Sequence, residues 1–277
     1  MSIDEIICQA LAEDIGEGDH TSDACIPTDT LGRARLLVKE AGVLSGVDVA
    51  LRVFRQVDPG LKVEVLMNDG AIIAKGDIVL TVSGRSNSIL KAERLVLNFM
   101  QRMSGIATQT HHLVQLIGQS KTRLLDTRKT TPLLRELEKM AVRAGGGHNH
   151  RFGLYDMVMI KDNHVDMSGG IAKAIDRVHS HFIRIGKVLP VEIEVRNMNE
   201  LAEAMSRGGI DRIMLDNFTP EQLKEAVHTV AGRFETEASG GINESNIAEY
   251  AMTGVDFISV GALTHHVRSL DLSLKAY

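Results

Sequence analysis

Basic side chains gather in one stretch of the sequence, residues 126–164, in short irregular segments beside apolar runs. The stretch contributes Arg128, Lys129, His150, Arg151 and Lys161. A charge next to a buried strand is costly unless an opposite charge compensates it. Arginine in addition matches carboxylates and phosphates through two parallel hydrogen bonds. The residue types and their spacing therefore predict a site for a small anionic ligand.

Local signals predict the elements that carry these cations. Residues 122–125 and 157–160 are apolar runs of strand length, and Thr131 followed by Pro132 is typical of a helix start. We expect a helix from Pro132 to the run of three glycines that ends it. The cations then lie in loops, and residues 161–164 form a polar loop after the second of these strands.

Strand and helix patterns alternate through the second half of the chain, which is typical of an α/β barrel. Helical patterns occupy residues 198–207, 220–231 and 244–252. Six strand-like runs are present, at residues 122–125, 157–160, 191–195, 212–215, 236–239 and 257–260. In such barrels the active site forms at the C-terminal ends of the strands. This rule selects Arg128, Lys129, Lys161, Glu194, Asp216, Ser239, Gly240, Gly241 and Gly261 from the residues alone.

The first half of the chain predicts a different architecture. Residues 33–38, 61–66 and 78–82 are strand-like, and residues 46–57 form an amphipathic helical pattern between them. Three or more strands with one covering helix indicate an α+β open sandwich. A helical run from residue 86 is expected to break at Ser104 and Gly105. We therefore expect a sandwich at 1–103, joined by residues 263–277, and a barrel at 104–262.

Composition excludes several classes of function. The 277 residues are 44% hydrophobic and 24% charged, with a net charge of -5, which gives no electrostatic reason to bind nucleic acid or an anionic membrane. There is no tryptophan to stack on bases. No apolar run reaches membrane-spanning length. Two cysteines, Cys8 and Cys25, make no disulfide framework, and without a signal peptide we expect a cytoplasmic protein.

Three multi-residue words, in this order and spacing, resemble the signature of the quinolinate phosphoribosyltransferase family. They are DTRKTTP at 126–132, GGGHNHRFGLYD at 145–156 and IKDNH at 160–164. The resemblance covers nearly the whole chain, through EDIGEGDHTS, RLVLNFMQRMSGIAT, EIEV, MLDNF, SGGI and SVGALTH. It implies an open barrel of seven strands after the sandwich, so one strand is expected beyond the six recognised by pattern.

The resemblance also implies a reaction and its partners. The enzyme would transfer the phosphoribosyl group of phosphoribosyl pyrophosphate to quinolinate and decarboxylate the adduct. The products would be nicotinate mononucleotide, pyrophosphate and carbon dioxide, in NAD biosynthesis. Mg²⁺ would be the cofactor. The working unit would be a homodimer or larger, because Arg102 is expected to reach into the active site of the partner subunit.

Residue roles follow from the resemblance combined with the strand-end rule. Lys129, Lys161, Glu194 and Asp216 are the catalytic candidates, and both carboxylates are candidates to stabilise an oxocarbenium-like ribose and to hold Mg²⁺. The residues expected around quinolinate are Arg102, Arg128, His150, Arg151 and Lys161, with Lys129 near the phosphoribosyl donor. Thr127 is a further candidate for substrate binding. The loop Ser239, Gly240 and Gly241, before a helix capped near Asn243, is assigned the ribose 5-phosphate, with Val260, Gly261 and Ala262 completing the cradle.

Other interpretations stay open. Glu194 or Asp216 taken alone would be typical of a strand-end salt bridge. His148, His150 and His164 match no helical zinc spacing, and nearby arginines would repel a cation. Three rival assignments are open. The chain could be a paralogous barrel protein associated with molybdenum transport, or a Schiff-base aldolase or decarboxylase that uses Lys161. It could also be a nucleotide sensor that binds phosphoribosyl compounds without converting them. Two positions depart from the family pattern: Leu133, which we expect in a first helical turn where leucine is acceptable, and His148.

Overall fold

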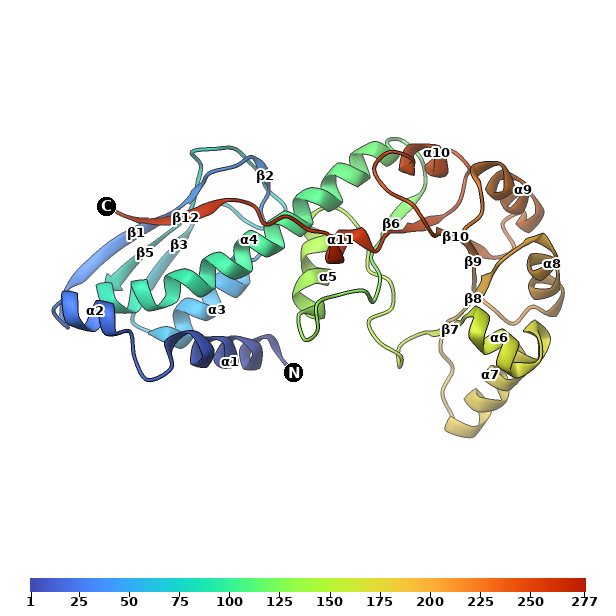
Figure 1. Ribbon diagram of the computed structural model, residues 1–277, viewed down its shortest axis with the longest axis horizontal. Helices are drawn as coiled ribbons and strands as arrows, with labels where there is room; N and C mark the ends of the chain where they lie inside the picture. The colour runs from blue at the N-terminus through green and yellow to red at the C-terminus, as the bar shows by residue number, and fades with distance from the viewer. The chain divides into compact units, whose positions relative to one another are not determined.

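The computed structural model describes residues 1–277, which form two compact units (Figure 1). Unit 1 comprises Met1–His111, Thr130–Gly146 and Leu263–Tyr277. Unit 2 comprises His112–Lys129 and Gly147–Ala262. The chain therefore leaves unit 1 and returns to it twice. No helix combines the length and apolar character needed to cross a membrane.

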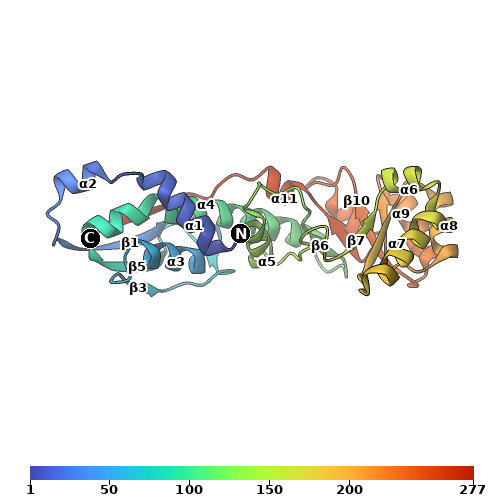
Figure 2. The same ribbon diagram turned by 90° about the horizontal axis from the view of Figure 1, so that it is seen from below.

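Unit 1 is built on an antiparallel sheet of four strands in the order β12-β1-β5-β3. In β1, buried Ala34 and Leu36 alternate with exposed Arg33 and Arg35, so one face of the sheet is buried. The helix α1 packs against α3 in the same unit (Figure 2). The elements that lie wholly or mostly in this unit are α1 (Ile3–Ile15), α2 (His20–Cys25), β1 (Leu31–Val38), β2 (Gly42–Val43), α3 (Val47–Val57), β3 (Lys62–Val65), β4 (Ile72–Ile73), β5 (Ile78–Arg85), α4 (Ser86–Ile117), α5 (Arg135–Ala144), α11 (Ala262–His265) and β12 (Leu272–Ala276).

The predicted helix break at Ser104 and Gly105 is wrong, because α4 is continuous through both residues. The two small residues serve close packing instead. The buried Ser104 hydroxyl donates to the carbonyl oxygen of Ser45 at 3.1 Å and accepts the Ser45 N–H at 3.0 Å. A Cβ on Gly105 would overlap the backbone carbonyl of Arg268. Tertiary contact thus overrides the weak helix propensity of serine and glycine.

Unit 2 contains a parallel sheet of six strands in the order β6-β11-β10-β9-β8-β7. All six predicted strand runs are confirmed. Helices α7, α8 and α9 lie on the convex side of the strands (Figure 1). The elements are β6 (Arg123–Leu125), β7 (Val158–Ile160), α6 (Asp162–Ser168), α7 (Ile171–Ile185), β8 (Val191–Val195), α8 (Met198–Arg207), β9 (Arg212–Asp216), α9 (Pro220–Val230), β10 (Glu235–Ser239), α10 (Ile247–Ala251) and β11 (Phe257–Ser259).

His148 extends this sheet beyond β6 by a single residue. Its N–H donates to the Leu124 carbonyl at 2.8 Å, and its carbonyl accepts the Asp126 N–H at 3.1 Å, which makes a parallel bridge to Leu125. This residue occupies the place where a seventh strand would pair. Glycines and polar residues surround it, so no apolar run marked it in the sequence.

Two other predictions about unit 2 are corrected. The expected polar loop at 161–164 is the start of α6, where the Lys161 N–H donates to His164 Nδ1 at 2.9 Å. The helix after the Ser239 loop begins at Ile247 and is not capped by Asn243. Asn243 Oδ1 instead accepts the Ser245 N–H in a tight turn. The helix α7 was not predicted, although Ile171, Ala174 and Ile175 show helical spacing.

The helix expected from Pro132 begins at Arg135, because Leu133 adopts a left-handed backbone with φ 68°. Replacing Leu133 with glycine should raise the free energy of unfolding by about 0.5 kcal/mol, because glycine reaches this conformation without steric cost. The Leu133 side chain is 66% exposed, so little packing is lost. Urea midpoints at fixed protein concentration test this. The exposed Leu154, which lacks positive φ, is the control: Leu154→Gly should destabilise, and a Leu133→Gly midpoint that also falls would contradict the prediction.

Candidate functional site

A group of ionisable side chains lies at the C-terminal ends of β7, β8 and β9 in unit 2. Lys161 follows β7, Glu194 lies near the end of β8, and Asp216 ends β9. Lys161 Nζ is 3.5 Å from Glu194 Oε2, and the Glu194 side chain is only 11% exposed. The fold therefore brings together residues that are distant in the sequence.

Their electrostatics link the group into one site. Burial, and then repulsion by Asp216, raises the pKa of Glu194, while Lys161 opposes the rise. Burial also raises the pKa of Asp216, and the charges of Lys161 and Lys129 oppose it. Carboxylates with raised pKa beside lysines are typical of functional sites. Such a group can hold a divalent cation or interact with a cationic reaction centre.

The loop after β10 is joined to Asp216 through Asn217. The Asn217 N–H donates to the Ser239 carbonyl at 2.9 Å, and its Nδ2 donates to Asp216 Oδ2 at 2.6 Å. Gly240 has φ 96°, and a Cβ there would overlap the Asn217 side chain. Gly240 therefore has to be glycine for the loop to approach Asp216.

Two further segments, the loop after β6 and the segment after β11, contain predicted site residues. Thr127 Oγ1 accepts the Lys129 N–H at 3.0 Å, which folds the loop after β6. The Val260 N–H donates to the Leu125 carbonyl at 3.0 Å, so the segment of Val260, Gly261 and Ala262 starts beside that loop.

Arg128 and Arg151 are near enough to repel each other. Burial, and then the charge of Arg128, lowers the pKa of Arg151. Arg151 donates to the Met157 carbonyl at 3.2 Å, which anchors the guanidinium to the residue before β7. Two crowded arginines in one unit are well suited to an anion with more than one carboxylate or phosphate group.

The buried Asp126 ties the two cationic loops together. Its Oδ1 accepts the His150 N–H at 2.8 Å, and its Oδ2 accepts from Asn149 Nδ2 at 2.6 Å. Asp126 directly follows β6, so it holds the segment that contains Arg151 next to the segment that contains Arg128.

The His150 ring is buried between two carboxylates that the sequence analysis did not single out. His150 Nε2 is 3.0 Å from Glu192 Oε2 and 3.3 Å from Glu237 Oε2. Both glutamates are 0% exposed. They lie on β8 and β10, two residues before Glu194 and Ser239, so they share the faces of those residues. For Glu192, its place between Val191 and Ile193 was the available signal.

Protonation in this cluster follows from burial and charge. Burial alone would lower the pKa of His150, but the hydrogen bonds and charges of Glu192 and Glu237 outweigh it and raise the pKa, because both carboxylates favour a proton on Nε2. Burial, and then repulsion by Glu237, raises the pKa of Glu192 to about 7. His150 and Arg212 lower the pKa of Glu237 against the effect of burial.

The same three groups could be considered as metal ligands, since their donor atoms lie within 4.8 Å of one another. The ring geometry argues against it. His150 Nδ1 accepts the Arg151 N–H at 2.7 Å, so the proton of the neutral ring is on Nε2. Nε2 therefore has no lone pair to offer a metal, and it donates toward Glu192 and Glu237 instead. A second proton enters the ring only if the Arg151 amide turns away from Nδ1.

Arg102 lies in unit 1, where a buried glutamate of α5 holds it. Its Nε and Nη2 donate to Glu138 Oε1 at 3.0 and 2.5 Å, and Nη2 also donates to Thr131 Oγ1 at 2.9 Å. Glu138 is 1% exposed. Glu138 is a third acid that was not predicted from the sequence.

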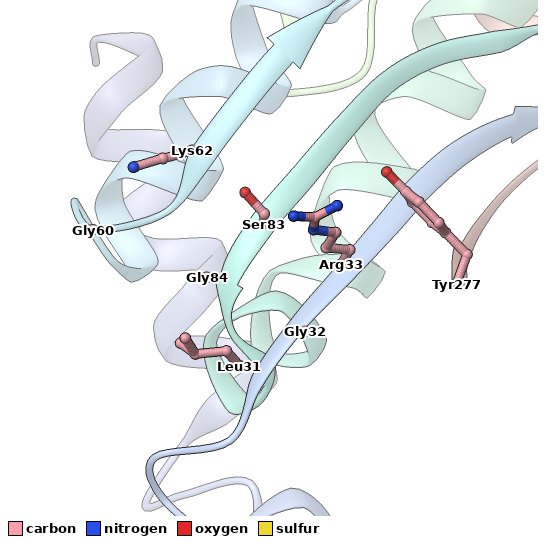
Figure 3. A pocket seen from close by; sticks show the side chains of 8 residues that line it. All are labelled: Leu31, Gly32, Arg33, Gly60, Lys62, Ser83, Gly84 and Tyr277. Atoms are coloured by element: carbon pink, nitrogen blue, oxygen red, sulfur yellow. The ribbon is translucent and has the colours of Figure 1, made fainter.

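A hollow of about 590 Å³ opens on the sheet of unit 1. Figure 3 shows Arg33, Lys62, Ser83 and Tyr277 around it. None of the predicted site residues lines this hollow. Its open shape on an exposed sheet face gives no reason to assign it a ligand.

Comparison with known proteins identifies the family. The model of the C-terminal domain of quinolinate phosphoribosyl transferase matches residues 106–275, and the model of its N-terminal domain matches residues 19–104. Quinolinate phosphoribosyltransferase [decarboxylating] 1b of Nicotiana tabacum is 45% identical over 98% of this chain and 81% of the relative. A probable nicotinate-nucleotide pyrophosphorylase [carboxylating] of Bacillus subtilis is 38% identical over 99% of this chain and 93% of the relative.

Solved structures agree with the sequence relatives. NadC from Streptococcus pyogenes has a TM-score of 0.94 at 40% identity and covers 99% of this chain and 95% of that chain. The nicotinate-nucleotide pyrophosphorylase from Francisella tularensis has a TM-score of 0.91 at 41% identity, covering 99% and 96%. The predicted fold of a sandwich followed by an incomplete barrel is confirmed. On both the sequence and the fold, the chain belongs to the quinolinate phosphoribosyltransferase family.

Proposed function

We propose that this chain transfers the phosphoribosyl group of phosphoribosyl pyrophosphate to quinolinate and releases carbon dioxide and pyrophosphate. Nicotinate mononucleotide is the product, an intermediate of NAD biosynthesis. The observation that carries the proposal is the combination of family membership with two cationic loops and two carboxylates at the strand ends of unit 2. The names of the relatives in tobacco and Bacillus subtilis describe the same reaction.

The cations of unit 2 suit the substrates. Quinolinate carries two carboxylates, and Arg128 and Arg151 repel each other until such a dianion lies between them. Lys129 interacts with Asp216, and Lys161 lies beside Glu194. These lysines would face the phosphates of the donor and the remaining carboxylate of quinolinate. The loop from Ser239 to Gly241 would receive the ribose 5-phosphate.

The carboxylates suit the bond that breaks. When pyrophosphate leaves the ribose, positive charge develops at the sugar carbon, and the pyridine nitrogen of quinolinate then forms the new bond. Glu194 and Asp216 can stabilise that charge at the strand ends. The pyridinium ring of the adduct accepts the electron pair of the breaking carbon–carboxylate bond, and a proton replaces the lost carbon dioxide. Binding and orientation therefore supply most of the catalysis.

Mg²⁺ is the cofactor that the site fits. Glu194 and Asp216 offer carboxylate oxygens, the ligands that Mg²⁺ prefers, and a divalent cation would relieve the repulsion that helps to raise the pKa of Glu194. The ion would neutralise the departing diphosphate. Removing divalent cations with a chelator should lower turnover at least about a hundredfold, and excess Mg²⁺ should restore it. Unchanged turnover in the chelator would contradict the assignment.

The test of the function is turnover of quinolinate with phosphoribosyl pyrophosphate and Mg²⁺, with nicotinate as the control substrate. We expect nicotinate mononucleotide and carbon dioxide in equal amounts from quinolinate and none from nicotinate. Folded protein that binds phosphoribosyl pyrophosphate but forms no product from quinolinate would overturn the proposal. That result would favour a nucleotide sensor or a transferase that uses another acceptor.

We also propose a dimer in which Arg102 completes the site of the partner subunit. Glu138 holds the Nε and Nη2 side of Arg102, which leaves Nη1 to reach another group. Mixing inactive Arg102→Ala and Lys129→Ala subunits in equal amounts should then restore about a quarter of the sites, because each mixed dimer contains one intact site. Activity after proven subunit exchange is the measurement. No recovery would place Arg102 in the site of its own subunit or outside any site.

The predicted cytoplasmic location is a separate proposal. Some plant relatives carry a mitochondrial or chloroplastic designation in their names. Fractionation of cells that express the chain, followed by activity measurement in each fraction, tests the location directly.

A further inference from the structure

Ionisable side chains are buried in the core beside the sheet of unit 2. In a barrel, apolar residues usually fill this core. Glu192 and Glu237 are fully buried, and the side chains of His150 and Arg212 are 4% and 12% exposed. Arg212 also stacks on the ring of Phe257, 3.9 Å from its centroid. The cluster is therefore packed in the core of this unit.

Short polar contacts connect the cluster to the backbone of Arg151. Arg212 Nη1 donates to Glu237 Oε2 at 3.0 Å, and Glu237 with Glu192 faces His150 Nε2. On the opposite edge of the ring, His150 Nδ1 accepts the Arg151 N–H at 2.7 Å. The chain of contacts begins at a buried arginine and ends at the backbone of Arg151.

Stability alone does not explain four buried ionisable groups. A buried ion pair contributes little net stability compared with apolar residues of the same shape. Removing one partner is costly, yet replacing the whole cluster with apolar side chains would be close to neutral. Glu192 Oε2 lies 3.0 Å from Nε2 of the His150 ring. We therefore expect the cluster to affect binding through the position of the His150 ring.

We infer that Glu192 and Glu237 are positioning residues for quinolinate binding: they hold the His150 ring so that its Nδ1 fixes the Arg151 backbone beside Arg128. The inference rests on the proposed function, which assigns Arg151 to a quinolinate carboxylate. With the ring held by two carboxylates at Nε2, Nδ1 has a single direction in which to accept the Arg151 N–H. Asp126 holds the other side of the same turn through the His150 N–H.

A weaker hold on the ring should displace Arg151 without reaching the phosphoribosyl subsites. Glutamine in place of Glu237 keeps the shape but removes the charge that attracts Nε2–H. Misplacement of a binding group by about 1 Å can cost about a hundredfold in rate. The loss should therefore fall on quinolinate, whose carboxylate Arg151 would bind, and not on phosphoribosyl pyrophosphate.

The experiment compares the steady-state kinetics of Glu192→Gln and Glu237→Gln with wild type. We expect KM for quinolinate to rise at least tenfold in each variant, with KM for phosphoribosyl pyrophosphate within twofold. Glu225→Gln, on the exposed surface of α9, is the control and should match wild type. Equal increases in both KM values, or a fall in kcat alone, would indicate a structural role and overturn the inference.

Arg151→Lys separates this inference from the proposed function. If Arg151→Lys leaves KM for quinolinate unchanged, the assignment of Arg151 to the substrate fails. If Arg151→Lys raises that KM but neither glutamine variant does, only the positioning role fails.

A measurement on the wild-type enzyme covers the case in which the glutamine variants do not fold. In protein with ¹⁵N-labelled histidine, His150 should show a protonated Nε2 and an unprotonated, hydrogen-bonded Nδ1. A proton on Nδ1, whether the ring is neutral or cationic, would overturn the inference.

Discussion

Replacing Lys161 with alanine is expected to lower kcat/KM for quinolinate by about 10²- to 10³-fold, the usual effect of removing one charge-stabilising group from an active site. Lys161 Nζ lies 3.5 Å from Glu194, and its charge opposes the raised pKa values of Glu194 and Asp216. Without this cation, anionic substrates would meet a site with two unbalanced carboxylates. Substrate binding should be weaker and phosphoribosyl transfer slower.

The Lys161→Ala protein should stay folded, because the Lys161 side chain is 47% exposed. Lys224→Ala, on the exposed surface of α9, is the matched control and should keep wild-type kinetics. Circular dichroism and the unfolding midpoint establish that both variants are native. A Lys161→Ala enzyme that keeps more than a third of wild-type kcat/KM would remove Lys161 from the proposed site.

Replacing Gly105 with alanine should destabilise the protein by about 3 kcal/mol, the upper part of the range for overpacking a core. The added Cβ would overlap the backbone carbonyl of Arg268, and backbone cannot move aside as the end of a side chain can. The segment before β12 would have to separate from α4. The pairing of β12 with β1 would then be weakened as well.

Urea denaturation at fixed protein concentration measures this effect. Gln109→Ala, one turn further along α4, controls for the intrinsic helix preference of alanine and should change stability by less than about 0.5 kcal/mol. A Gly105→Ala protein as stable as wild type would mean that the backbone near Arg268 can relax without cost.

Periodicity in the sequence was sufficient for most of unit 2. The six strands were recognised because strand-like runs alternate with helical patterns, and α8 was predicted with the bounds it has. The strand-end rule then placed Lys161, Glu194 and Asp216 at one edge of the sheet, because parallel strands all end on the same side. These features are local, or follow from topology that local patterns imply.

Other elements could not be predicted because their cause is not local. Gly105 resembles a helix breaker, yet it is required for contact with Arg268, a residue far along the chain. Leu133 has ordinary helix propensity, yet the turn at the start of α5 holds it in a left-handed conformation. His148 pairs with β6 through a single bridge, and no run of apolar residues in the sequence indicates this pairing.

The sequence by itself determined the family, the alternation of strands and helices, and the residues available for an anion site. Only the tertiary structure decided what surrounds each charge. Glu192 and Glu237 look like ordinary members of alternating strands until the sheet brings them to the ring of His150. Arg102 looks like a solvated helix residue until α5 sets Glu138 against it. The physical reason is that the energy of a charge depends on its burial and its partners, and both are properties of the folded chain.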